Sequence, residues 1–183
     1  YTRKKNYGVV SRWLMLPTLH DLDFSDDDTV INCHQNITAY ERQIAQLLRV
    51  PLAKAVHLLS EKINKIGLLK GRDHRTLHAT LLRLWCLSGD DAAVKQAINT
   101  FESSLLFSVK LDCINAVKYL DENLVDQWFQ QLLDDNDNHP NIANQWFRCI
   151  SSSCLPNRLP ALNKAIESPY FSWKNPNNVY ALL

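Results

Sequence analysis

Apolar side chains recur at intervals of three and four residues along most of this chain, and this period constrains the fold more than any other feature. In residues 121–133, for example, Val125, Trp128 and Leu132 fall on one face of a helix. No segment shows the sustained two-residue alternation of a β-strand. Only 4 glycines occur in 183 residues, which leaves few positions for tight hairpin turns. The sequence therefore predicts an all-α fold of about eight to ten helices.

Residues that cap helices mark where several of these helices begin. Thr38 and Glu41 form a capping box, in which each side chain bonds a backbone N–H of the first turn, so a helix is predicted to start at Thr38. Asp90 and Asp121 each precede a segment of helical period and are predicted N-caps. Pro140 suits the first position of a helix, where a backbone N–H has no partner to lose.

The apolar pattern also assigns side chains to the core. On the helix from Thr38, one face carries four residues: Tyr40, Ile44, Leu47 and Leu48. The next helix is expected to begin at Pro51, to end at Gly67 or Gly71, and to bury five residues: Ala55, Leu58, Leu59, Ile63 and Ile66. The helix expected over residues 73–87 is apolar on more than one face, which predicts a central position.

The lengths of the helices and turns favour a repeat architecture. Two such helices with their turns occupy about 34 residues, the length of a typical helical-hairpin repeat. We expect a right-handed array of antiparallel helix pairs, an α-solenoid, that forms a single domain over residues 1–183. The first 37 residues are less regular. No sequence repeat is visible, so a compact helical bundle remains the competing architecture.

Charge and hydropathy narrow the classes of partner. A formal net charge of +1 gives no global attraction to nucleic acid or to a membrane surface. No apolar run approaches the ~20 residues that a membrane helix needs. The chain begins at Tyr1 and ends at Leu183 in the middle of an apolar pattern, which predicts that it is part of a longer protein.

The cysteines indicate a reducing compartment. They are odd in number, widely spaced and without a Cys-x-x-Cys pair: Cys33, Cys86, Cys113, Cys149 and Cys154. This pattern is typical of reduced, buried thiols rather than of a disulfide framework. We therefore expect a cytoplasmic protein.

Motifs for catalysis or metal binding are incomplete. His74 and His78 are four residues apart on one helix face, as in zinc sites. The zinc metallopeptidase motif has Glu after its first His, to activate the metal-bound water, whereas Arg75 stands there in this chain. The acidic run over residues 21–28 lacks the spacing of a calcium loop and is expected to be a solvated turn. The sequence predicts no catalytic residue, metal or cofactor within this chain.

A family resemblance rests on four segments. Residues 169–182, Pro-Tyr-Phe-Ser-Trp-Lys-Asn-Pro-Asn-Asn-Val-Tyr-Ala-Leu, resemble the end of the helical region of bacterial aminopeptidase N, which reads His-x-x-Phe-x-x-x-Asn-Pro-Asn-Arg-x-Arg-x-Leu. Upstream, residues 145–147, 75–84 and 16–19 are similar to that family's Lys-Trp-Phe, Arg-x-Leu helix and Leu-Pro-Ser/Thr elements. The resemblance spans nearly the whole chain, and the Asn-Pro-Asn block is its specific part.

The resemblance implies a role without catalysis. The family consists of alanyl aminopeptidases of the gluzincin type, whose zinc is held by His-Glu-x-x-His in a separate catalytic domain. Their C-terminal helical domain covers that site and shapes peptide access. For this chain it implies two partners, the catalytic domain of the same protein in cis and the peptide substrate, and neither nucleic acid nor membrane. The alternative is a stand-alone helical-repeat scaffold that binds a protein partner.

The Asn-Pro-Asn block supplies the candidate site residues. Asn175 and Asn177 bracket Pro176, so the block either caps a helix or lines a substrate channel. Where the family has two Arg, this chain has Asn178 and Tyr180, and these neutral side chains imply altered docking or substrate handling. The candidates for channel lining or domain docking are therefore Asn175, Asn177, Asn178 and Tyr180.

Overall fold

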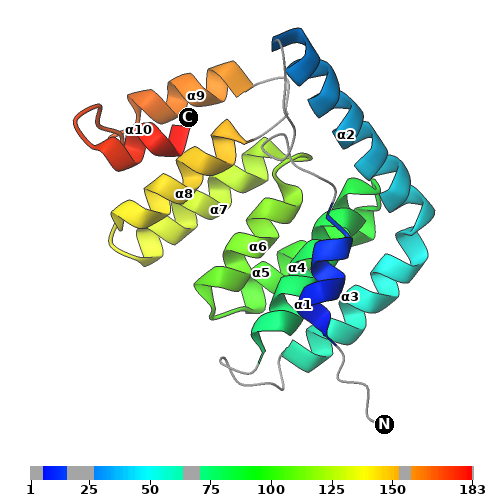
Figure 1. Ribbon diagram of the computed structural model, residues 1–183. Coiled ribbons are helices and arrows are strands. Elements are labelled where there is room, and N and C mark those ends of the chain that lie inside the picture. The colour runs from blue at the N-terminus through cyan, green and yellow to red at the C-terminus, as the bar shows by residue number, and fades with distance from the viewer. Residues whose placement is uncertain (1–5, 16–26, 64–70, 153–157, 183) are drawn as a thin grey trace. The chain divides into compact units, whose positions relative to one another are not determined.

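The computed structural model describes residues 6–15, 27–63, 71–152 and 158–182. These ranges contain ten helices and no strand, which confirms the predicted all-α class (Figure 1). The helices are α1 (Tyr7–Trp13), α2 (Asp27–Leu47), α3 (Arg49–Ile63), α4 (Arg72–Leu87), α5 (Asp91–Ser103), α6 (Phe107–Val117), α7 (Glu122–Asp135), α8 (Pro140–Ser151), α9 (Arg158–Glu167) and α10 (Pro176–Leu182). The chain divides into two compact units, residues 1–116 and 117–183. The expectation of a single domain stays a prediction.

Unit 1, residues 1–116, is built around α4. This helix packs against α1, α2, α3 and α5, which confirms the central position predicted from its apolar faces (Figure 1). Its side chains fill the core from several directions, and those buried include Leu77, Leu81, Leu82, Leu84, Trp85, Cys86 and Leu87.

The helix caps form as the sequence predicts. Asp90 accepts the Ala92 N–H at 3.0 Å, and Asp121 accepts the Leu124 N–H, also at 3.0 Å. Pro140 is the first residue of α8. Each cap satisfies a backbone donor that the helix itself leaves without a partner, a contribution of about 1 kcal/mol.

The prediction that a helix starts at Thr38 is wrong. Helix α2 begins at Asp27 and passes through Thr38, so the segment of residues 1–37 also contains α1 and the first turns of α2. The predicted apolar face of α2 is exposed, whereas Ala45 is buried. Glu41 holds α2 on α4 through two hydrogen bonds from Arg83, at 2.6 and 3.0 Å. Of the turn predicted over residues 21–28, residues 21–26 lie outside the described residues, and Asp27 and Asp28 begin α2.

The predicted core face of helix α3 is confirmed at Leu59 and wrong at Leu58. Leu52, Val56 and Leu59 are buried, but Leu58 is 60% exposed. Adjacent residues of a helix point about 100° apart, so Leu58 lies to one side of the face that Leu59 buries. The predicted end at Gly67 lies outside the described residues, as does the predicted core residue Ile66, and α3 is described as far as Ile63. Gly71, the other predicted end, is the N-cap position of α4.

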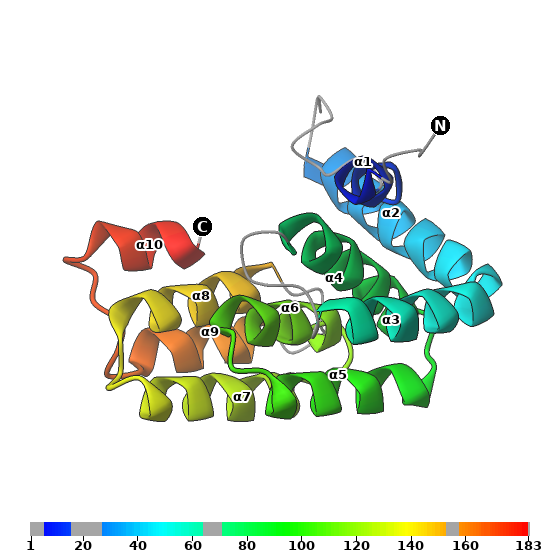
Figure 2. The ribbon, with the colours of Figure 1, turned by 90° about the horizontal axis from the view of Figure 1, so that it is seen from below.

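Unit 2, residues 117–183, is organised by α8, which packs against α7, α9 and α10 (Figure 2). Phe147 is completely buried, and its ring meets Phe171 edge to face at a centroid distance of 5.5 Å. A tight turn between α7 and α8 places Asp137 and Asn138 in the left-handed region, at φ of 52° and 55°. The Asn138 N–H then bonds the Leu133 carbonyl at 2.8 Å, which closes the end of α7.

None of the helices in the described ranges combines the length and apolar character that a membrane span requires.

Candidate functional site

Asn175 caps helix α10. Its Oδ1 accepts the Asn177 N–H at 3.0 Å, and its carbonyl accepts the N–H groups of Asn178 and Val179. Pro176 is the first residue of the helix, a position that needs no N–H. The capping role predicted for the Asn-Pro-Asn block is confirmed for Asn175.

Asn178 is a buried connector within unit 2. Its side chain is 2% exposed. Its Oδ1 accepts the Ser172 N–H at 3.0 Å, and its Nδ2 donates to Asn144 Oδ1 on α8 at 2.7 Å. Both ends of the amide therefore tie the segment before α10 to α8.

Removing this amide should weaken unit 2. Asn178→Ala removes two part-buried hydrogen bonds, to the Ser172 N–H and to the Asn144 side-chain oxygen, each worth about 0.5–1.5 kcal/mol, so we expect a loss of about 1–3 kcal/mol in the free energy of unfolding. Asn177→Ala is the matched control, because Asn177 is exposed one position away on the same helix. Urea unfolding of both variants provides the measurement, and equal losses in the two would contradict the connector role.

Asn177 and Tyr180 lie at the surface of unit 2. Tyr180 is 73% exposed, and Trp173, which meets Phe171 edge to face at 5.0 Å, is 69% exposed. Large aromatic side chains in water are suited to contact a partner. A docking or channel-lining role for the four candidate residues stays a prediction. Of the four, Asn177 and Tyr180 have side chains that are free to contact a partner.

In unit 1, the apolar face of α2 forms a second candidate surface, which we name the α2 stripe. Its members follow helical spacing, and their exposed fractions are Tyr40 62%, Ile44 38%, Leu47 84% and Leu48 38%. Sequence periodicity identified this face of α2 as apolar, but unit 1 does not bury its side chains. Exposed apolar side chains that follow one helix face make this stripe a candidate interaction surface.

The two histidines considered for zinc have separate structural roles. His78 is buried, and its Nε2 lies 2.9 Å from Ser60 Oγ, which in turn donates to the Val56 carbonyl. Burial lowers the pKa of His78 to about 4. The ring of His74 packs against Tyr7 at 4.3 Å between centroids. In the described ranges, no three His, Cys, Asp or Glu side chains come together as a metal ion would require.

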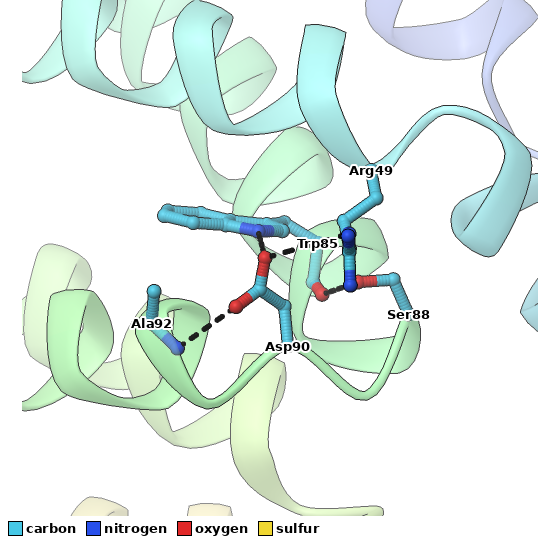
Figure 3. A network of polar contacts seen from close by, with 5 residues as sticks. All are labelled: Arg49, Trp85, Ser88, Asp90 and Ala92. Carbon is cyan, nitrogen blue, oxygen red and sulfur yellow. Dashed lines mark hydrogen bonds and ion pairs between the residues drawn. The ribbon is translucent and has the colours of Figure 1, made fainter.

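The corner between α4 and α5 contains a polar network (Figure 3). Trp85 Nε1 donates to Asp90 Oδ2 at 3.1 Å, and Arg49 Nε lies 3.9 Å from the same oxygen. The hydrogen bond from Trp85, with that from Ala92, holds the pKa of Asp90 below its usual value. This carboxylate stays ionised and joins α3, α4 and α5, so it is a structural group rather than a general acid.

Three cysteines, one each on α4, α6 and α8, are buried. Cys86, Cys113 and Cys149 are free thiols. Burial raises the pKa of Cys86 to about 12 and that of Cys149 to about 11, and it also raises the pKa of Cys113. Since the thiolate is the reactive form, none of these three is suited to nucleophilic chemistry. Predictions for the side chains of Cys33 and Cys154 fall outside the described residues.

Together these observations describe a helical chain whose two units each expose apolar or aromatic side chains. The chain matches over residues 2–183 the family described as a domain of unknown function, DUF3458_C, with ARM repeats, and it belongs to that family. No curated protein matches it in sequence.

Solved structures add a likeness of fold. The crystal structure of Legionella pneumophila aminopeptidase A in complex with aspartic acid is similar over 98% of this chain, with a TM-score of 0.76 and 19% sequence identity. The matched region covers only 22% of that aminopeptidase. The chain thus resembles the C-terminal helical domain of an aminopeptidase, in agreement with the family resemblance of its sequence.

Proposed function

We propose that this chain is the non-catalytic helical domain of a longer, aminopeptidase N-like zinc enzyme in the cytoplasm, which removes N-terminal residues from peptides. The observation that carries the proposal is the match of nearly all of this chain to 22% of an aminopeptidase. The zinc site would then belong to the remainder of the longer protein. The domain would cover that site and restrict which peptides reach it.

The α2 stripe would be the surface of unit 1 that docks on the remainder of the protein. Leu47 is 84% exposed, and full burial of a leucine side chain stabilises an interface by about 1.5–3 kcal/mol. Four such side chains on one helix face would make a continuous apolar seam.

A peptidase assay tests the proposal. An alanyl fluorogenic substrate is incubated with zinc and with either this chain or the longer protein. We expect hydrolysis by the longer protein and none by this chain. Hydrolysis by this chain would contradict the proposal. No hydrolysis by either protein would favour the alternative, a helical-repeat scaffold, which also fits the ARM-repeat description of the family.

A charge placed on the α2 stripe should disrupt docking. Leu47→Asp should weaken association with the separately produced remainder of the longer protein at least about tenfold, because the lost burial is worth more than 1.4 kcal/mol. Leu105→Asp makes the same change at a residue that is 100% exposed between α5 and α6, and it serves as the control. Titration by calorimetry measures both affinities. If Leu47→Asp binds as tightly as Leu105→Asp, the stripe is not the docking surface.

A further inference from the structure

Unit 2 contains an open pocket of about 520 Å³. It lies between α7, α8, α9 and the segment that follows α9, and the residues that matter for its chemistry are Gln130, Trp146, Asn163, Lys164, Glu167 and Tyr170. None of these residues takes part in the function proposed above.

The positive charge at the pocket is already neutralised. Lys164 forms an ion pair with Asp126 Oδ2, while Asp126 Oδ1 accepts a hydrogen bond from Trp146 Nε1 at 2.9 Å. Asp126 therefore holds both the lysine and the indole from outside the lining. Asp126 thus offsets the charge of the Lys164 ammonium group, whose side chain is 63% exposed.

The negative charge at the pocket has no such partner. Glu167 forms no ion pair with any residue in the described ranges. It is also the last residue of α9, where the terminal carbonyl groups carry a partial negative charge. The carboxylate and the helix end both favour a cation at this side of the pocket.

The remaining walls suit a flat or extended cationic group. Trp146 and Tyr170 contribute aromatic surface, and Tyr170 is fixed by the hydrogen bond of its hydroxyl to Asn138 Oδ1 at 3.0 Å. Aromatic rings attract cations, and a guanidinium group can stack on a ring while it pairs with a carboxylate. Gln130 and Asn163 add amide groups that can bond a peptide backbone.

We propose that this pocket binds the guanidinium side chain of an arginine in a peptide, with Glu167 as its ionic partner and Trp146 and Tyr170 as its aromatic walls. The site would select peptides by a basic residue. The inference rests on unit 2 alone and holds whether or not the chain belongs to a peptidase.

Calorimetric titration of the 183-residue chain at low salt tests the proposal. The probes are the blocked pentapeptide acetyl-Ala-Ala-Arg-Ala-Ala-amide and the same peptide with citrulline, the neutral isostere of arginine. We expect the arginine peptide to bind at least about fivefold more tightly, with a difference that shrinks as salt rises. Equal affinities for the two peptides, or no binding of either, would overturn the proposal.

Matched variants locate the interaction. Glu167→Gln should abolish the preference for arginine over citrulline, whereas Glu102→Gln, the same change at an exposed position on α5, should preserve it. Tyr170→Leu should also weaken arginine binding, and thermal unfolding of each variant confirms that it is folded. A preference that survives Glu167→Gln contradicts the assigned partner. Tighter binding of spermidine than of the arginine peptide would show a polyamine site instead of a peptide site.

Discussion

Replacing Phe147 with alanine should lower the free energy of unfolding of unit 2 by about 3–5 kcal/mol. The side chain is completely buried in α8, the helix against which α7, α9 and α10 pack. Its loss removes a large apolar surface, leaves a cavity, and breaks the edge-to-face contact with Phe171, which is worth about 0.5–1.5 kcal/mol. Because Phe171 lies before α10, we expect the C-terminal segment to loosen first.

Urea unfolding followed by circular dichroism measures this effect. Leu159→Ala is the control, since Leu159 on α9 is 69% exposed and its truncation should change stability by less than about 0.5 kcal/mol. A loss below about 1 kcal/mol for Phe147→Ala would mean that the core of unit 2 does not depend on this ring.

Acid should destabilise unit 1 through His78. Burial lowers the folded-state pKa of His78 from 6.5 to about 4, so between these values the unfolded chain binds a proton that the folded chain does not. The stability that neutral His78 contributes is present above pH 6.5 and is lost as pH falls to 4. The full contribution is about 3 kcal/mol, at 1.36 kcal/mol for each pKa unit.

Asp112 on α6 should act in the opposite direction over nearly the same interval. Burial raises its pKa from 3.8 to about 6, against a smaller opposing effect of Arg75. Its contribution to stability is complete below pH 3.8 and is lost as pH rises through 6. The two groups therefore offset each other in the native chain, and single variants should separate them.

Urea midpoints between pH 4 and pH 7.5 provide the test. Asp112→Asn should steepen the loss of stability toward acid and should stabilise the chain at pH 7.5. His78→Gln should reverse the slope, so that this variant gains stability as pH falls from 6 to 4. If the native chain and the two variants gave parallel curves of stability against pH, neither group would carry a burial penalty of this size.

The features that followed from the sequence are local ones. Asp90, Asp121 and Asn175 cap their helices because a side-chain oxygen and a backbone N–H two or three positions later meet without help from the rest of the chain. The all-α class followed from the same short-range period. Even here one local signal misled, because the Thr38 and Glu41 pattern of a capping box lies inside α2.

The features that the sequence did not reveal depend on distant residues. Asn178 donates a hydrogen bond to Asn144 on another helix, and no sequence pattern near Asn178 predicts that contact. The pocket around Glu167 exists because α7, α8 and α9 meet there. Leu58 and the α2 stripe have the period of core residues, yet they are exposed, because periodicity gives a face of the helix and not what covers it.

The exposed α2 stripe also bears on the turnover of this protein in the cell. Chaperones and proteases act on chains that display apolar surface. Any copy whose stripe has found no docking surface would display Leu47 and its neighbours and would compete for refolding or degradation. Because the proposed docking surface belongs to the same protein, quality control would then remove the copies in which the domain has not docked.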